Sequence, residues 1–172
     1  MPRRRSLHAI LFLLAVLAPS ACLASQFTLV NGNFSFSVPD GWPRIMQTRG
    51  DPETMVFQVP DSSPSRQESL ARVSVTSKQV RDLTAFQAFV AEDTAHAQAL
   101  PGFQLDKQRS TPTAYYYTAT EGSAEQTFTA HYYFHDGYAV QVRCVRPSHS
   151  QAGNEWTRAF DEGCARITSS LR

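Results

Sequence analysis

The feature that most constrains the fold is a long pair of strand-like segments near the C-terminus. The segments EQTFTAHYYFH (125–135) and YAVQVRCV (138–145) flank Asp136-Gly137, a dipeptide typical of two-residue β-hairpins. The register of such a hairpin pairs Tyr133 with Val140, His131 with Val142, Thr129 with Cys144, Phe134 with Ala139 and Phe128 with Val145. The first three pairs share one face of the sheet and the last two share the other, so both faces carry large apolar side chains.

Apolar side chains on both faces require cover on both faces. A sheet with one solvated face would alternate cleanly between apolar and polar residues, and these two segments do not. We therefore expect an α+β fold in which helices pack on both faces of an antiparallel sheet, a three-layer α/β/α sandwich. The hairpin signals along the chain argue against a parallel βαβ fold.

The other periodicities predict four strands, a helix, four strands and a second helix. Alternating apolar residues predict strands at 27–30, 34–38, 54–59 and 71–77, and Asn31-Gly32 suggests a two-residue turn between the first two. Asp82 is placed to cap a helix that ends at Pro101-Gly102. Strands at 103–108, 113–120, 125–135 and 138–145 follow, and a helical stripe spans 154–171.

The N-terminus has the pattern of a secretory signal peptide. Arginines at 3–5 precede the apolar run at 9–18, which is too short to span a bilayer, and no comparable run follows. We favour cleavage after Ala24, which would make Ser25 the first mature residue and 25–172 a single domain. The alternative is a lipobox-like cleavage before Cys22 with a lipid anchor there. It is disfavoured because Pro19 stands where a lipobox has leucine.

If the chain is exported, Cys144 and Cys164 are the two cysteines left in the domain, and a disulfide between them is the simplest interpretation. Cys144 lies on the same strand face as Val140 and Val142, and Cys164 lies in the apolar stripe of the last helix. Two independent periodicities therefore point the thiols toward each other. The alternative is two unpaired buried cysteines. A redox role is not indicated, because catalytic pairs usually occur as CxxC at a helix N-terminus.

The charge balance argues against nucleic acid as a partner. The chain has 16 basic and 15 acidic residues, and loss of the three N-terminal arginines would leave it close to neutral. The charges are mixed rather than blocked, so no basic face is available for nucleic acid.

The segment FSVPDGW (36–42) and the order of elements resemble the PsbP-like superfamily. Its members include extrinsic photosystem II subunits, a Ran-binding nuclear import factor, the bacterial envelope lipoprotein DcrB and chaperones for type VI secretion effectors. The resemblance implies an α/β/α sandwich that acts through its surface, without a shared catalytic constellation. With a bacterial-style signal peptide, it points to the bacterial envelope.

Motifs for catalysis and metal binding are missing from the sequence. There is no GxSxG, HExxH, P-loop or dinucleotide fingerprint. His131 and His135 share a strand face but stand about 13 Å apart along it, too far for both to bind one metal ion. We therefore expect no enzyme activity, no cofactor and no metal.

Five residues are candidates for a partner or ligand surface: Trp42, Tyr116, His131, Tyr133 and His135. Aromatic and amphipathic side chains anchor many protein interfaces. Ordinary packing is the favoured interpretation of each, and Trp42 is expected to fill the junction between the sheet and the next layer.

We expect a periplasmic or secreted accessory protein that binds a protein partner in the cell envelope, for example an immunity or assembly factor. The alternative function is a carrier that holds a small molecule or lipid in a pocket between sheet and helix.

Overall fold

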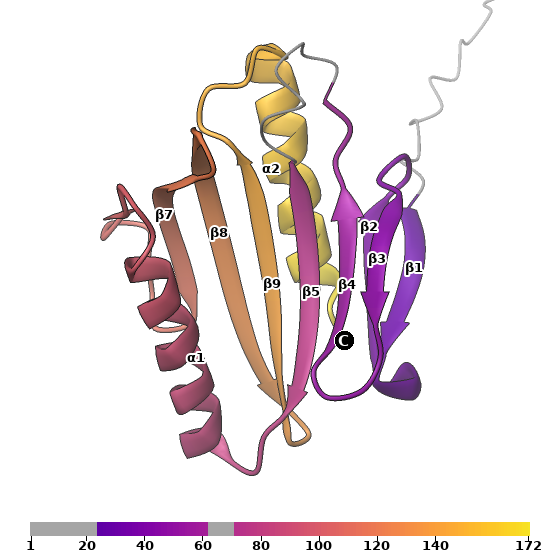
Figure 1. Ribbon diagram of the computed structural model, residues 1–172. Helices are drawn as coiled ribbons and strands as arrows, with labels where there is room; N and C mark the ends of the chain where they lie inside the picture. Colours follow the sequence, from indigo (N-terminus) through magenta and orange to yellow (C-terminus); the bar gives the residue numbers. More distant parts are fainter. Residues whose placement is uncertain (1–23, 62–70) are drawn as a thin grey trace, which may run out of the picture.

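A computed structural model describes residues 24–61 and 71–172 (Figure 1). Of the predicted signal peptide (1–24), residues 1–23, which include Cys22, lie outside the described residues, and Ala24 is the first residue of β1. The strands are β1 (Ala24–Leu29), β2 (Phe34–Pro39), β3 (Arg44–Thr48), β4 (Glu53–Gln58), β5 (Arg72–Gln79), β6 (Gln104–Leu105), β7 (Ala114–Glu121), β8 (Ala124–His135) and β9 (Tyr138–Pro147). The helices are η1 (Val30–Gly32), α1 (Leu83–Gln98) and α2 (Gly153–Ser170).

Antiparallel pairing organises the described strands into two sheets. The main sheet has the order β3-β4-β5-β9-β8-β7-β6, and β1 pairs only with β2 in a separate two-stranded sheet. The antiparallel α+β fold is therefore confirmed.

The β8–β9 hairpin has the predicted register. His135 pairs with Tyr138 across a two-residue loop, and all five predicted pairs are present. Asp136 and Gly137 have φ values of 47° and 77°. Two successive left-handed residues are what a tight hairpin turn of this kind requires, which explains the Asp-Gly sequence.

The N-terminal hairpin differs from the prediction. Leu29 pairs with Phe34, so the connection contains four residues and includes η1. Val30 and Asn31 have φ values of 52° and 54°. The Asn31-Gly32 signal marked the right turn, but the loop is longer than two residues.

Strand β3 was not predicted. Its pairing with β4 shifts between Arg44 and Met46, so the strand contains a bulge, and Ile45 and Met46 are both about half exposed. A bulge breaks the two-residue side-chain period by which strands are recognised in a sequence.

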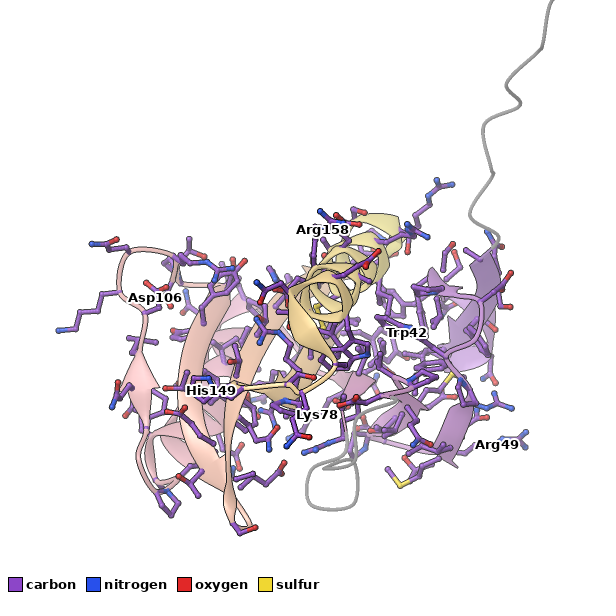
Figure 2. The ribbon with its side chains drawn as sticks, turned by 90° about the horizontal axis from the view of Figure 1, so that it is seen from above. Trp42, Arg49, Lys78, Asp106, His149 and Arg158 are labelled. Carbon is purple, nitrogen blue, oxygen red and sulfur yellow. A yellow bond between two sulfur atoms is a disulfide. The ribbon has the colours of Figure 1, made fainter. Side chains whose placement is uncertain are left out.

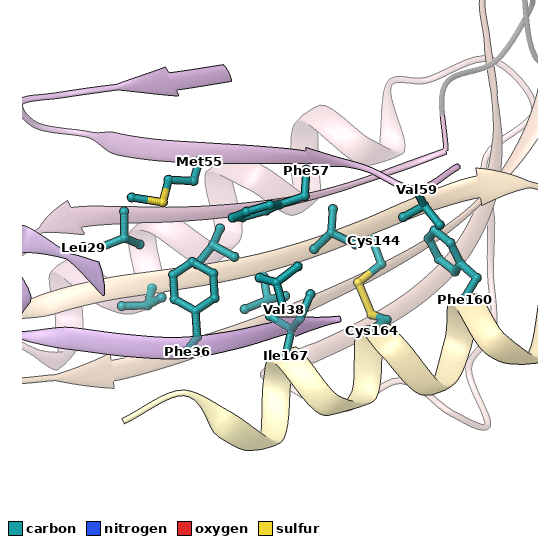
Figure 3. Packing of buried hydrophobic residues seen from close by; sticks show 14 of the residues in the cluster. Leu29, Phe36, Val38, Met55, Phe57, Val59, Cys144, Phe160, Cys164 and Ile167 are labelled. Atoms are coloured by element: carbon teal, nitrogen blue, oxygen red, sulfur yellow. A yellow bond between two sulfur atoms is a disulfide. The ribbon is translucent and has the colours of Figure 1, made fainter. Parts of the chain in front are cut away.

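One face of the main sheet is covered by α2 together with the β1–β2 hairpin. The two lie side by side, because Ser37 N–H donates to Ser170 Oγ at 2.8 Å and Ser35 exchanges backbone hydrogen bonds with Arg172. Figure 3 shows how side chains from the hairpin, α2 and β4 converge on β5 and β9. The buried core here includes Leu29, Phe34, Phe36, Val38, Met55, Phe57, Val73, Val75, Val140, Val142, Phe160 and Ile167.

The predicted disulfide lies in this core. Cys144 and Cys164 are bonded, with 6.3 Å between their Cα atoms, and both are at least 95% buried. The bond joins the middle of β9 to the middle of α2 (Figure 3).

Helix α1 covers the opposite face. Asp82 caps it as predicted, accepting a hydrogen bond from Ala85 N–H at 2.8 Å. Phe86 and Val90 pack on Ala130 and Tyr132 of β8. Layers on both faces confirm the sandwich, although a β-hairpin shares the α2 layer, which was not predicted.

The segment around Trp42 closes one end of the α2 layer. Trp42 N–H donates to Pro39 O at 3.2 Å, which turns the chain after β2. The indole stacks on Phe160, with ring centroids 5.9 Å apart, and lies against Gly163. A Cβ at position 163 would approach the indole to 2.3 Å, so the close contact requires glycine. Trp42 therefore packs on α2 at the edge of the core between this layer and the sheet, which agrees with the packing role expected for it.

The two layers are offset across the sheet, although both α-helices contact β9. Figure 1 shows α1 beside β7 and β8, whereas α2 lies behind β9 and β5. On the α2 side, neither described α-helix packs over the outer part of β7 and β8. None of the described helices is long and apolar enough to cross a membrane.

Candidate functional site

On the side of the sheet that faces α2, the part of β7 and β8 that α2 does not cover forms a candidate binding surface, which we call the open face. Alternation along β7 and β8 directs one set of side chains to this side, and the register places Tyr116 beside Thr129 and Thr118 beside Thr127. All are partly exposed. The open face consists of Arg109, Tyr116, Thr118, Thr127, Thr129, His131 and Tyr133.

Tyr116 is the centre of the open face. Its hydroxyl lies 3.5 Å from Nε2 of His131, and the two rings meet edge to face with centroids 5.7 Å apart. The guanidinium of Arg109 lies over the Tyr116 ring, 4.2 Å from its centroid. A cation at this distance is attracted by the ring electrons.

The loop after β6 holds Arg109 in this position. The Asp106 side chain accepts hydrogen bonds from the N–H groups of Gln108 and Arg109, at 3.0 and 3.2 Å. Ser110 Oγ then accepts a hydrogen bond from Tyr116 N–H at 3.1 Å. Because Asp106 begins a turn, β6 has only two residues instead of the predicted strand at 103–108.

A small cavity adjoins the open face at this end of the sheet. Its volume is about 280 Å³, and Leu105, Arg109, Tyr116 and Thr118 are among the residues that line it. A side chain of a partner could enter this cavity while contacting the Tyr116 ring.

Tyr133 borders the open face next to α2. Its hydroxyl donates to Thr168 O at 3.3 Å, and burial raises the pKa of the phenol. Tyr133 and His131 thus lie on the α2 side of the sheet, as the predicted register required. Tyr133 links the open face to the C-terminal turn of α2.

The other two candidate residues lie elsewhere. Figure 2 shows Trp42 and Asp106 on opposite sides of α2. His135 is exposed at the β8–β9 turn, with Nε2 3.1 Å from Oδ2 of Asp136. The structure therefore brings together Tyr116, His131 and Tyr133 and separates them from the other two. Among the described residues, no three His, Cys, Asp or Glu side chains cluster as a metal site would.

His131 gives the open face a pH-dependent element. Burial lowers the pKa of its imidazole below the usual value of about 6.5. Well above that value the imidazole is neutral in both the folded and the unfolded chain. As the pH falls, the imidazole of the unfolded chain takes up a proton first. His131 therefore contributes stability that is present above about pH 6.5 and is lost as the pH falls through the lower folded-state pKa.

We expect His131→Gln to flatten the pH dependence of the unfolding free energy between about pH 7.5 and pH 5.5. Urea unfolding at several pH values measures this, and His149→Gln is the matched control because that side chain is almost fully exposed. If the unfolding free energy of wild type and of His131→Gln changed equally with pH, a lowered pKa of His131 in the folded protein would be contradicted.

A second polar group of residues was not predicted, and it lies beneath α1. The carboxylate of Asp93 accepts hydrogen bonds from Arg143 Nη2 at 2.5 and 2.6 Å and from Gln141 Nε2 at 2.7 Å. It also accepts from the Tyr132 hydroxyl. Burial and the hydrogen bond to Asp93 raise the pKa of the Tyr132 phenol. Burial alone would lower the pKa of the Arg143 guanidinium, but the neighbouring Asp93 carboxylate raises it overall.

The sequence did contain a signal for this cluster. Asp93 lies three residues after Val90 and four before Ala97, so a carboxylate occupies the buried face of α1. Arg143 alternates with Gln141 and Ala139 on the strand face that α1 covers. A charged residue in an apolar helix stripe and another on a covered sheet face indicate a pair. Because three side chains of the sheet donate hydrogen bonds to the carboxylate, we interpret the cluster as an anchor for α1.

Comparisons with known proteins address the fold. No protein-family model and no curated protein sequence matches the chain. LpqN, involved in cell envelope biogenesis of Mycobacterium tuberculosis, matches with a TM-score of 0.57 and 12% identity, over 86% of this chain and 90% of that chain.

Two further solved structures are similar to this chain in fold. The Ran-binding protein Mog1p of Saccharomyces cerevisiae has a TM-score of 0.54 and 12% identity, over 88% of this chain and 96% of that chain. Cyanobacterial PsbP from Synechocystis sp. PCC 6803 has a TM-score of 0.50 and 10% identity, over 88% and 92%. At these identities the likeness shows the fold alone. The chain has the PsbP-like fold, as its resemblance to that superfamily implied.

Proposed function

We propose that this protein, with its PsbP-like fold, is an exported accessory protein of the bacterial cell envelope that binds a protein partner through the open face and catalyses no reaction. The observation that carries the proposal is the open face itself: Tyr116 and His131 lie outside the part of the sheet that α2 covers, and the exposed side chain of Arg109 stacks on the Tyr116 ring. Tyrosine and arginine are enriched at the energetic centres of protein interfaces.

The envelope location is supported by the predicted signal peptide and by the fold shared with an envelope biogenesis protein. An immunity protein or an assembly factor would use such a surface, because both act by holding a partner. The partner should offer acceptors to Arg109, whose planar guanidinium can still donate hydrogen bonds at its edge while it stacks on a ring.

A carrier of lipid or another apolar molecule is less well supported. Two cavities between α1 and β5 measure about 460 and 190 Å³, and charged side chains line both. Lys78 and Glu92 line the two of them, with Arg81 and Asp82 in the larger and Asp93 and His96 in the smaller. Pockets for small molecules usually measure about 300–1,000 Å³ and are mostly apolar. The partner-binding function is therefore preferred.

Site-specific photo-crosslinking in the producing cell tests where a partner binds. A photoreactive residue at Thr129, in the open face, should give one defined protein adduct. The same residue at Thr76, on the other side of the sheet, should not. Adducts at Thr76 but not at Thr129 would refute the open face as the binding surface.

We expect Arg109→Ala to weaken binding of the crosslinked partner by about tenfold or more, because centrally placed arginines often contribute over about 1.4 kcal/mol. The matched control is Arg44→Ala, since Arg44 also lies over a ring, that of Phe27, but at the β3 end of the sheet. Titration calorimetry with the purified partner measures both variants. Equal affinities for the two would contradict the proposal.

A further inference from the structure

A polar cavity lies at the other end of the sheet from the open face. Its volume is about 600 Å³, and its lining comes from β1, η1, the β3–β4 segment, β5 and β9. Figure 1 shows the β3–β4 turn and the adjoining ends of β5 and β9 at the same end of the molecule. Arg49, which lines it, and Asp106, beside the open face, lie at opposite ends of the molecule in Figure 2. The lining residues are Thr28, Val30, Asn31, Gln47, Arg49, Gly50, Asp51, Glu53, Ser77, Gln79 and Tyr138.

The strands change from apolar to polar where this cavity begins. The inward face of β5 continues from Val73 and Val75 to Ser77 and Gln79. The inward face of β4 continues from Phe57 and Met55 to Glu53, which pairs with Ser77 in the neighbouring strand. Two adjacent strands thus replace core residues by polar ones at the same level.

Ser77 is the observation that points to a ligand. The residue is only 2% exposed and lines the cavity, and among the described residues its Oγ has no hydrogen-bond partner. A buried hydroxyl without a partner is unfavourable, whereas an apolar residue such as Val73 or Val75 on the same strand face would have been stable here. A bound molecule that hydrogen-bonds to Oγ would remove this penalty.

The acidic side chains around the cavity are held in place by the protein. Glu53 Oε2 accepts from Val30 N–H at 2.7 Å, and its Oε1 lies 3.4 Å from Gln47 Nε2. Asp51 Oδ1 accepts from Gln79 N–H at 2.8 Å. These bonds fix the hairpin tip and the β3–β4 turn against the end of β5, so the walls of the cavity are preorganised.

The chemistry of the lining favours a neutral ligand rich in hydroxyl groups. Three carboxamides and three hydroxyls, each able to donate and to accept, surround the space. Sugar hydroxyls have the same dual capacity. Two carboxylates and one guanidinium leave the lining slightly acidic, which disfavours anions. The volume lies within the range of about 300–1,000 Å³ for small-molecule pockets.

We propose that this cavity binds a neutral sugar and that Ser77 Oγ hydrogen-bonds to one of its hydroxyl groups. The site shares no lining residue with the open face, so the proposal does not depend on the partner-binding function.

Titration of the ¹⁵N-labelled protein with glucose, galactose, mannose and N-acetylglucosamine, monitored by NMR, tests this site. At least one sugar should give saturable shifts of the side-chain amides of Gln47 and Gln79 and of the backbone of Ser77. Glucuronate, an anionic analogue, should bind more weakly. The absence of saturable shifts with all four sugars, or stronger binding of glucuronate, would overturn the proposal.

Ser77→Ala should weaken the sugar that binds by about fivefold to tenfold, the value of one neutral hydrogen bond. It should leave the fold at least as stable as before, because it removes an unpartnered buried hydroxyl. Ser74→Ala is the matched control, since Ser74 lies on the same strand but faces the other side of the sheet. Equal sugar affinity in Ser77→Ala and Ser74→Ala would remove Ser77 from the site.

Discussion

Replacing Cys144 and Cys164 together by Ala is expected to lower the free energy of unfolding by about 3 kcal/mol while the fold is kept. The two residues are 20 positions apart, and in the chain-entropy model a cross-link over such a loop restricts the unfolded chain by about that amount. Domains of this size are stable by only about 5–15 kcal/mol, so the loss is a large fraction. Urea unfolding of the oxidised protein measures it.

The wild-type protein in reducing buffer is the control for this double variant. Reduction removes the cross-link but keeps both sulfur atoms in the core, so it separates the effect of the bond from that of lost packing. We expect reduction to account for most of the loss. A change below about 1 kcal/mol on reduction would mean that the bond adds little to folding.

The parts of the fold that the sequence predicted are those with local, uninterrupted patterns. Asp136-Gly137 determines the turn between β8 and β9, and strict alternation then determines which residues share a face with Cys144. The apolar stripe of α2 placed Cys164 on the buried side. A two-residue period and a 3.6-residue period were enough to predict a contact between distant residues.

The parts of the fold that the sequence did not predict depend on interruptions of the alternating pattern or on contacts between distant segments. The bulge between Arg44 and Met46 hides β3. The β1–β2 hairpin was expected as strands, but nothing in its own alternation says that it packs beside α2 instead of joining the main sheet. That choice depends on side chains from β1, β2, β4, β5, β9 and α2 meeting in one core (Figure 3).

The same distinction applies to the candidate sites. Tyr116 and His131 lie on different strands, so alternation assigns them to one sheet face only together with the β7–β8 register, which pairs Tyr116 with Thr129. Arg109 could not, because a turn made by Asp106 directs it onto the Tyr116 ring. Asp93 and Arg143 each break an apolar pattern, but their pairing depends on how α1 is placed over β9.

Asp93→Ala is expected to lower the free energy of unfolding by about 3 kcal/mol or more, because it leaves the guanidinium of Arg143 beneath α1 without its counter-charge. The side chains of Asp93 and Arg143 are only 18% and 28% exposed. The substitution also removes the acceptor of Tyr132 and Gln141. Since the carboxylate is bound by three side chains of β8 and β9, α1 should detach first, and hydrogen exchange in 83–98 should accelerate more than in α2.

Asp161→Ala is the matched control, because it removes the carboxylate of another pair between an aspartate on a helix and an arginine on β9. Asp161 accepts from Arg146 Nε at 2.9 Å but is 56% exposed, so its loss should cost below about 1 kcal/mol. The double variant Asp93→Leu with Arg143→Met should recover much of the stability, since no buried charge remains unpaired. If Asp93→Ala and Asp161→Ala were equally mild, the cluster would not be the anchor of α1. If the double variant were worse than Asp93→Ala, the loss would not come from an unpaired arginine.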